Sequence, residues 1–478
     1  MEQSRDLCHM NKLPPSLRAS LLSDAQYGKT KRWSIQALAE LNNKKISQNE
    51  ETSVSSTPHT DAKRLNGGNL SPVNKPSKEV AECLIREVHV RLARQHDKCV
   101  DMISHVELMR NNSHPAKQHV APMTSGTKRM IKAVNNAVHS SLRDQQTMLQ
   151  ECSIEEQKAL KLLQNLQLVH ADTYQLTHHF LNSYTTIQRF NKADQHVIEA
   201  ALEQIRSRHA HTVEDLADVV VGMRKTSYLK RQFLPGLANH DVFGMSSNET
   251  LIVEPFLRER LGIQLLCDHY VGFCKGRPYG GVSVHVDLWD VIHEASIEAQ
   301  HVCDANHGFA PEVHLFRFDD AKLKFTLIRP WVHHSLVEIF KNAMASSVDK
   351  SKVTMSTQSQ QQPPSAPPIN VRVINTDQQI AIQIIDEGVG LNDHSKRKAF
   401  VFAETSSSRR WDRLHDQQSY AAVRAPLASL GVGLPLSRMI MQVFGGDVTL
   451  SENNGDGCTA ALILSKDLSV PERDIGAE

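Results

Sequence analysis

Long apolar runs are scarce in this 478-residue sequence, and none approaches the roughly 18 residues that a membrane-spanning helix requires. The N-terminus also lacks the apolar stretch of a secretory signal peptide, so the sequence does not favour secretion. Residues 1–34 carry Arg, Lys and Ser together with Glu2, Asp6 and Asp24. Mitochondrial transit peptides are poor in acidic residues, so this region favours import only weakly. We expect no integral membrane segment.

An excess of charge is also missing, since 54 Lys and Arg face 53 Asp and Glu, for a net charge of +1. The chain as a whole therefore has no strong attraction for nucleic acid, and we expect no such partner. The eight cysteines form no Cys-x-x-Cys pair and lack a zinc-like histidine spacing. With 40% apolar and 22% charged residues, the composition is typical of a soluble globular protein.

The chain changes character along its length. Residues 43–78 are polar and rich in Ser, Asn, Thr and Pro, which indicates an exposed insertion at the end of an N-terminal segment, 1–78. Across 79–240, apolar residues recur at helical spacing and predict a helical bundle, interrupted by a loop at 111–127. Strands and helices are mixed across 250–470, which predicts an α/β sandwich domain. The fold class we predict is α+β.

The predicted C-terminal domain consists of one sheet with helices on one face. Its strands are expected at 282–286, 313–317, 323–328, 371–374, 380–385, 448–451 and 459–464. Its helices are expected at 255–275, from about 287, at 331–346 and from about 434. A second low-complexity loop is expected at 347–368.

Three polar residues recur at steps of four in the predicted helix that starts at Trp331. His334, Glu338 and Asn342 therefore share one face of that helix. An amide oxygen is a hard ligand that suits magnesium, and a carboxylate can accept a proton from an attacking hydroxyl. Taken alone, such a stripe is more often an ordinary solvated helix face, so its meaning depends on the other motifs.

Glycines follow two of the predicted elements. Asp386, Gly388 and Gly390 come directly after a strand, where glycine lets backbone approach a ligand and a carboxylate can bind an amino group. Gly431 and Gly433 precede a helix, whose free N–H groups suit phosphates, although this segment is not a P-loop. Each of these motifs alone is also typical of a turn or a helix cap.

A fourth motif, Gly455-Asp-Gly-Cys-Thr459, enters the last predicted strand, where the Thr459 hydroxyl can bond a ligand directly or through water. Taken in order, the motifs resemble the N, G1, G2 and G3 boxes of the GHKL ATPase superfamily, which includes histidine kinases, type II topoisomerases and Hsp90 chaperones. This resemblance implies a Bergerat α/β sandwich with a mobile lid within residues 391–430.

A closer resemblance narrows the family. The run Glu338-Ile-Phe-Lys-Asn-Ala-Met344 is similar to the E-L-F-K-N-A-M of mitochondrial pyruvate dehydrogenase kinases and branched-chain 2-oxo acid dehydrogenase kinases. Upstream, 206–213, 260–269 and 87–95 resemble segments of the helical domain of these kinases. Residues 260–263 and Gly308-Phe-Ala-Pro311 lean towards the branched-chain kinase. The resemblance covers roughly residues 80–470, without the insertions.

The resemblance implies a protein-serine kinase of the mitochondrial matrix. With Mg²⁺ and ATP it would phosphorylate the E1 α subunit of pyruvate or branched-chain 2-oxo acid dehydrogenase and inhibit that complex. It implies Glu338 as general base, assisted by His334, with Asn342 as the magnesium ligand. It further implies docking on the lipoyl domain of E2 and a homodimer. The ATP contacts that it implies are Glu338, Ile339, Phe340, Lys341, Asn342, Ala343, Met344, Ala345, Asp386, Gly388, Gly390, Thr405, Ser406, Ser429, Leu430, Gly431, Val432, Gly433, Leu434 and Thr459.

This sequence departs from the family at Gln264, Ala345, Ser429 and Leu430, and it lacks the C-terminal Asp-Trp of pyruvate dehydrogenase kinases. Two other functions therefore stay open. A protein-histidine kinase would need a phosphoacceptor histidine followed by an acid, which neither histidine of 209–211 has. A scaffold that binds ATP without transferring phosphate is opposed by the presence of both Glu338 and Asn342, while the altered glycine loop favours it.

Overall fold

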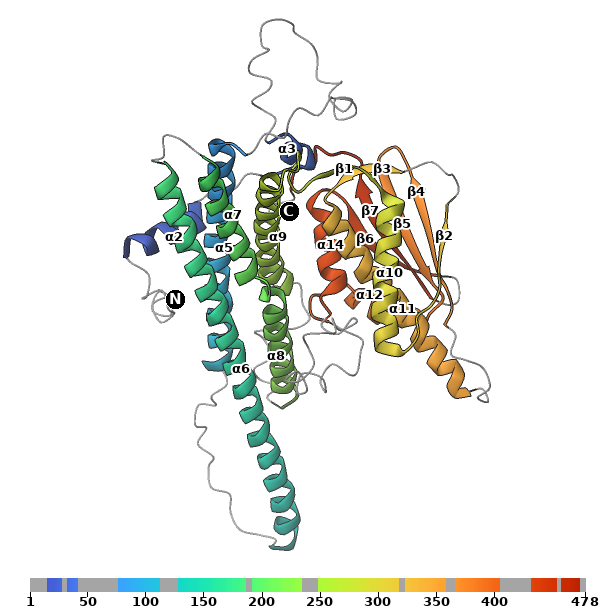
Figure 1. The fold of residues 1–478 in the computed structure, drawn as a ribbon. Coiled ribbons are helices and arrows are strands. Elements are labelled where there is room, and N and C mark those ends of the chain that lie inside the picture. Colours follow the sequence, from blue (N-terminus) through green and yellow to red (C-terminus); the bar gives the residue numbers. More distant parts are fainter. Residues whose placement is uncertain are drawn as a thin grey trace, which may run out of the picture. The chain divides into compact units, whose positions relative to one another are not determined.

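The structure is a computed structural model in which helices precede a mixed sheet (Figure 1). It describes residues 15–27, 32–41, 76–111, 128–185, 191–233, 248–317, 323–357, 366–404, 431–453 and 457–472. The helices of the N-terminal half are α2 (Pro15–Tyr27), α3 (Ile35–Glu40), α5 (Lys78–Asn111), α6 (Lys128–Thr185), α7 (Lys192–Arg208), α8 (Thr212–Phe233) and α9 (Asn248–Cys274). The expected α+β class is confirmed.

The chain divides into two compact units that are not consecutive in sequence. The first comprises Met1–Thr30, Val88–Phe180 and Ile205–Ile263, and the second comprises Lys31–Glu87, Leu181–Gln204 and Gln264–Glu478. The division predicted from the sequence, at 1–78, 79–240 and 250–470, stays a prediction.

The first unit is helical, and it contains α2, α8 and parts of α5, α6, α7 and α9. Its buried faces carry the apolar residues that the helical spacing predicts, such as Leu92, Leu163 and Val220. Histidines interrupt this core: His170 Nε2 lies 3.0 Å from Gln95 Oε1, and His209 Nε2 lies 3.1 Å from Thr173 Oγ1. The bundle therefore contains a buried polar layer.

The second unit contains a five-stranded sheet in the order β2-β4-β5-β7-β6. Strands β2 and β4 are parallel, and all other neighbours are antiparallel. The strands of this sheet are β2 (Val313–Phe316), β4 (Ile369–Asn375), β5 (Gln379–Asp386), β6 (Asp447–Glu452) and β7 (Cys458–Ser465). The helices beside it are α10 (Leu288–His307), α11 (Arg329–Thr357), α12 (Asp393–Lys398) and α14 (Gly433–Val443).

One face of this sheet carries helices, as predicted. Helix α11 packs on β5 and β7, α14 packs on β6 and β7, and α10 packs on α11 (Figure 1). Along β5, Ile380, Ile382 and Ile384 are buried, and alternation places Asp386 on the same face at the end of the strand. The sheet therefore directs Asp386 towards the helical layer.

Two expectations need correction. Residues 347–357 were expected in a loop, but α11 continues through them to Thr357 because Ser347, Val348 and Ser351 still face the interior. The expected single sheet is also wrong, since β1 (Ser283–Asp287) and β3 (Lys324–Leu327) form a separate two-stranded antiparallel sheet. The polar composition of residues 347–357 indicated a loop where the helix continues. The separate sheet depends on which strands pair, and the periodicity of a sequence does not determine that.

Other local expectations are confirmed. The turn between β4 and β5 is closed by Thr376, whose N–H and hydroxyl both donate to the Gln379 carbonyl, at 2.9 and 3.0 Å. Pro435 lies in the first turn of α14, and Gly445, with φ of +79°, follows its last turn. Among the described residues, no helix has the length and apolar character needed to cross a membrane.

Candidate functional site

Helix α11 carries the polar stripe predicted from the sequence. The Glu338 carboxylate accepts a hydrogen bond from Lys341 Nζ at 2.6 Å, and the two side chains are only 14% and 9% exposed. Asn342 Nδ2 donates to the Glu338 carbonyl at 2.7 Å, which fixes the amide nitrogen on the helix. The Asn342 amide oxygen takes no part in that bond, and it is the atom of this side chain that could bind a metal.

His334 lies one turn before Glu338 on the same helix, and its side chain is exposed. Neighbouring protein atoms desolvate its ring and lower the pKa of His334, while the Glu338 carboxylate acts in the opposite direction. The structure therefore places His334 within electrostatic reach of Glu338, as an exposed neighbour of the carboxylate.

Gly433, the first residue of α14, packs against Glu338. A Cβ atom at Gly433 would overlap Glu338 Oε2, so this position accepts only glycine without a rearrangement. The cap position before it, Val432, provides no side-chain hydrogen bond to the helix N-terminus. The carboxylate of one predicted motif thus lies against the glycine segment of another, although 95 residues separate them in the sequence (433 − 338).

Asp386 ends β5 with its side chain 4% exposed. Its Oδ1 accepts the Gly388 N–H at 2.9 Å. Burial raises the pKa of Asp386, and this shift is opposed by hydrogen bonds from the Gly388 and Cys458 backbone, by the Ser346 hydroxyl and by the charge of Lys350. Asp386 is therefore a buried carboxylate held in place from three segments of the chain.

The predicted glycines around Asp386 leave no room for side chains. A Cβ at Gly388 would overlap Ser346, and a Cβ at Gly457, where φ is +85°, would overlap the Asp386 carbonyl. Gly390 also has a positive φ, of +73°. Glycine therefore lets the turn at Gly457 approach the Asp386 backbone and the turn at Gly388 approach Ser346 more closely than a residue with a Cβ would allow.

Thr459 is linked to Asp386 through a residue that sequence reasoning did not identify. The Thr459 hydroxyl donates to Asn453 Oδ1 at 2.6 Å, and Asn453 Nδ2 donates to the Asp386 carbonyl at 3.0 Å. Strand pairing sets Thr459 opposite Ile385 and Cys458 opposite Asp386. Since the link depends on this pairing, no local signal in the sequence could have revealed it.

Ser346 is the second residue that was missed. It lies one turn after Asn342 and its Oγ accepts the Val389 N–H at 3.1 Å. The signal was present, because Ser346 continues the stripe of steps of four beyond Asn342. Of the other residues in the run 338–345, Ile339, Phe340, Ala343 and Met344 are buried in the core, while Ala345 is half-buried.

The glycine segment before α14 is described from Gly431 onward. Gly431 has φ of +65°, its carbonyl accepts the Ala403 N–H at 2.9 Å, and a Cβ would overlap the Glu404 backbone. Val432 and Leu434 are half-buried beside it. The other four predicted contacts in this region, Thr405, Ser406, Ser429 and Leu430, lie outside the described residues, as does most of the predicted lid.

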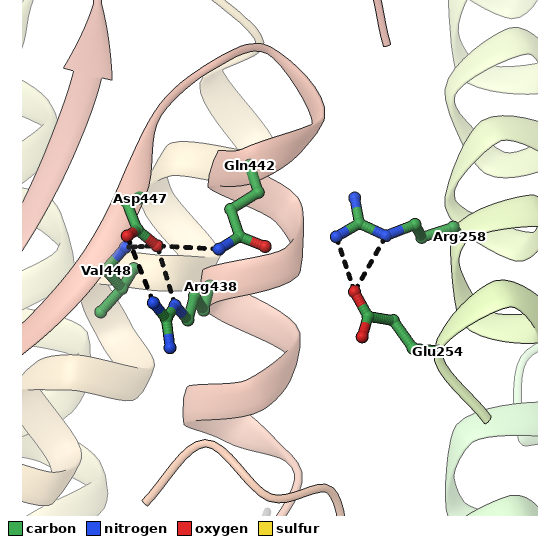
Figure 2. A network of polar contacts seen from close by, with 6 residues as sticks. All are labelled: Glu254, Arg258, Arg438, Gln442, Asp447 and Val448. Carbon is green, nitrogen blue, oxygen red and sulfur yellow. Dashed lines mark hydrogen bonds and ion pairs between the residues drawn. The ribbon is translucent and has the colours of Figure 1, made fainter. Parts of the chain in front are cut away.

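A polar cluster fixes α14 to the sheet (Figure 2). Asp447 Oδ1 accepts hydrogen bonds from Arg438 Nε at 2.9 Å, from Gln442 Nε2 at 3.1 Å and from the Val448 N–H at 2.9 Å. Because Arg438 and Gln442 lie on α14 and Asp447 begins β6, the cluster sets the position of the helix that Gly433 opens. Figure 2 also shows the pair of Glu254 and Arg258, one turn apart within α9.

Together, the site contains a carboxylate and an amide on one helix, two glycine turns that approach them and a buried aspartate at a strand end. Residues 331–468 match the family of histidine kinase-, DNA gyrase B- and HSP90-like ATPases. This segment is therefore similar to the GHKL ATPases, and the predicted resemblance to that superfamily is confirmed.

The chain is also similar to curated mitochondrial protein kinases. It is 26% identical to the pyruvate dehydrogenase (acetyl-transferring) kinase of Schizosaccharomyces pombe over 55% of this chain and 58% of that protein. It is 26% identical to human isozyme 4 of this kinase over 56% of this chain and 61% of that protein, and 24% identical to the Drosophila melanogaster kinase over 56% and 62%. The matched region thus spans less than two thirds of each relative. The resemblance predicted from the sequence is confirmed.

Proposed function

We propose that this protein is a mitochondrial protein-serine kinase that uses Mg²⁺ and ATP. The observation that carries the proposal is the contact between Glu338 and Gly433, with Asn342 one turn away. Glu338 is a candidate proton acceptor and Asn342 a candidate metal ligand, and Glu338 contacts the backbone at the N-terminus of α14. Phosphoryl transfer depends on such positioning and on neutralisation of charge around the transferred group.

The residues present fit ATP and Mg²⁺. Asp386 is a buried carboxylate that can accept a hydrogen bond from an adenine amino group, and Thr459 is tied to the same strand end. The glycines at 388, 431 and 457 allow close packing of the chain around the proposed site, since a Cβ there would overlap Ser346, the Glu404 backbone and the Asp386 carbonyl respectively. The glycine segment at 431–434 would cradle phosphate, and the Asn342 amide oxygen would bind the metal.

Each residue of the helix has a part in the proposed reaction. Glu338 accepts the proton of the attacking serine hydroxyl, which makes that oxygen a stronger nucleophile. Lys341 holds one oxygen of the carboxylate, and His334 lies where it can tune the charge of Glu338. When bound, Mg²⁺ supplies charge neutralisation to the phosphates.

The names of the relatives support a pyruvate dehydrogenase as the substrate. Within this proposal the phosphorylated chain is the E1 α subunit of pyruvate or branched-chain 2-oxo acid dehydrogenase, and its phosphorylation inhibits the complex. The word mitochondrial in their names supports a mitochondrial location, and within this proposal the location is the matrix. The helical bundle is proposed to dock on the lipoyl domain of E2, which would raise the effective concentration of E1.

A homodimer is part of the proposal. The sheet face opposite the helices exposes Phe316, 49% accessible, and Ile374, 42% accessible. Phe316 on the edge strand β2 pairs with Arg372 on β4, and Ile374 lies two residues after Arg372 on the same strand. The side chains of Phe316 and Ile374 are therefore on the same face of the sheet, near one edge. An apolar patch on a sheet face supports contact with a second copy of the chain.

Two alternatives give different results in one experiment. One observation opposes a protein-histidine kinase: His209 is buried and hydrogen-bonded to Thr173, which leaves it poorly placed as a phosphoacceptor.

The full chain should be incubated with radiolabelled ATP and the purified E1 proteins of both complexes. An acid-stable label on E1 serine supports the proposal, an acid-labile label indicates phosphohistidine, and no label with ATP bound indicates a scaffold. Asn342→Ala serves as the inactive control.

A further inference from the structure

Ser346 joins helix α11 to the turn that follows β5. Its Oγ accepts the Val389 N–H at 3.1 Å, and the hydroxyl also stabilises the charged form of the Asp386 carboxylate. Gly388 packs so closely on Ser346 that a Cβ there would overlap the serine. One hydroxyl thus contacts both the turn backbone and the buried carboxylate, which are separated from it by 40 residues of sequence (386 − 346).

The remaining partners of the Asp386 carboxylate belong to the backbone. They are the Gly388 N–H, at 2.9 Å from Oδ1, and the Cys458 backbone across the β5–β7 pair. Lys350, on α11, contributes charge. Lys350 acts through its charge, whereas Ser346 is the α11 side chain that contributes a hydrogen bond to this carboxylate.

We propose that Ser346 is a positioning residue for purine recognition, which orients Asp386 to accept the exocyclic amino group of adenine. The inference rests on the proposed function of this site as an ATP site. Under this proposal, Ser346 contributes to the preference of the site for adenine over a purine that carries an oxygen in place of the exocyclic amino group. A hydroxyl that holds an acceptor in place reduces the cost of ordering that acceptor when ligand binds.

The neighbouring residue provides a matched control. Ser347 lies on the same helix and is fully buried, yet within the described part of the chain its hydroxyl has no hydrogen-bond partner. Serine to alanine is the same chemical change at both positions, and alanine is a strong helix former. A loss that comes from helix packing would appear in both variants, whereas a loss that comes from Asp386 would appear only at Ser346.

The test compares ATP with inosine triphosphate, whose base carries an oxygen where adenine has its amino group. Dissociation constants of both nucleotides, with Mg²⁺, would be measured by calorimetry on the full-length chain. For Ser346→Ala we expect ATP to bind about tenfold more weakly, the scale of one hydrogen bond to a charged group, while inosine triphosphate is unchanged. Ser347→Ala should keep both affinities.

Asp386→Asn should remove most of the ATP affinity, and adding Ser346→Ala to it should cost little more, since the serine acts through the aspartate. Should Ser346→Ala be unstable, Ser346→Cys keeps the volume with a weaker hydrogen-bonding group and should give an intermediate ratio of the two affinities. Circular dichroism and melting temperature report the folding of each variant.

An unchanged ratio of ATP to inosine triphosphate affinity in Ser346→Ala, within about twofold, would overturn the inference. So would an equal fall of that ratio in Ser347→Ala. If either result came with lost ATP binding in Asp386→Asn, the proposed ATP site would stand and only the role of Ser346 would be wrong. Normal ATP binding by Asp386→Asn would instead overturn the proposed site itself.

Discussion

Lys341 Nζ lies 2.6 Å from Glu338 Oε1, and both side chains are largely withdrawn from solvent. The pair spans one turn of α11, while the other carboxylate oxygen faces Gly433. The lysine thereby fixes the orientation of the proposed general base. Removal of one member of a buried ion pair leaves the other charge uncompensated, which is more damaging than the loss of an exposed pair.

We predict that Lys341→Met lowers both stability and phosphoryl transfer. The unpaired Glu338 should cost roughly 3 kcal/mol of unfolding free energy, and the carboxylate should lose its fixed orientation. Lys341→Arg, which keeps the charge, should recover most of the stability. Lys352→Met on the same helix removes an exposed lysine and should cost under about 1 kcal/mol. Equal losses in the two methionine variants, measured by urea unfolding, would contradict the prediction.

Asn342→Ala should weaken binding of Mg²⁺–ATP far more than it lowers the melting temperature. The variant loses the amide oxygen proposed to bind the metal, together with a hydrogen bond to the Glu338 carbonyl worth about 1 kcal/mol. Asn306→Ala is the matched control, because its Nδ2 makes the same bond to the Val302 carbonyl on an exposed helix face. If the loss of nucleotide affinity is fully explained by the loss of folded protein, Asn342 has an ordinary structural role.

Local patterns in the sequence predicted those parts of the site that short segments define. The spacing of His334, Glu338 and Asn342 placed them on one face, and glycines marked the turns where backbone comes close to Asp386. The partner of Glu338, Lys341, follows at a spacing of three and could have been predicted in the same way.

Pairing between distant segments was beyond sequence reasoning. The link from Thr459 through Asn453 to Asp386 exists because β5 and β7 pair in one register. The length of α11 was underestimated for another reason, since Ser347 and Ser351 are polar by type yet buried by position. Composition indicated a loop there, and tertiary packing overrode it.

The histidines of the helical bundle predict that stability depends on pH. Burial lowers the pKa of His96 to about 4 and that of His209 to about 4, and Arg260 adds to the shift at His209. An unfolded histidine titrates near a pKa of about 6.5 and so binds protons that the folded protein excludes. Stability should be full above about pH 6.5 and fall as the pH drops towards 4, by about 1.4 kcal/mol per pH unit for each histidine.

Urea unfolding at a series of pH values between 7.5 and 5 would measure this slope. His209→Gln keeps a group able to donate to Thr173 but cannot titrate, so it should reduce the slope by about one proton. A slope in His209→Gln equal to that of the unsubstituted protein would show that His209 does not exclude a proton.

The last prediction concerns Glu338, where the kinase and the scaffold differ. Its carboxylate is fixed by Lys341 and lies against Gly433, so its basicity would act at the phosphate end of the site. Glu338→Gln keeps the shape and an oxygen that Lys341 can still bind, while it removes the basicity. We expect near-normal ATP binding and a transfer rate to E1 serine reduced by about 10² to 10⁴, which is roughly 3–5 kcal/mol.

His334→Ala should reduce the rate less, because His334 acts through Glu338, and the double variant should be little worse than Glu338→Gln alone. Glu312→Gln is the control, since this exposed carboxylate also lies beside a histidine, His314. Single-turnover transfer at saturating ATP isolates the chemical step from binding. A rate for Glu338→Gln within a factor of about three of the unsubstituted protein is under 1 kcal/mol, too little for a general base. With ATP still bound, that result would leave an ATP-binding domain whose catalysis, if any, does not pass through Glu338.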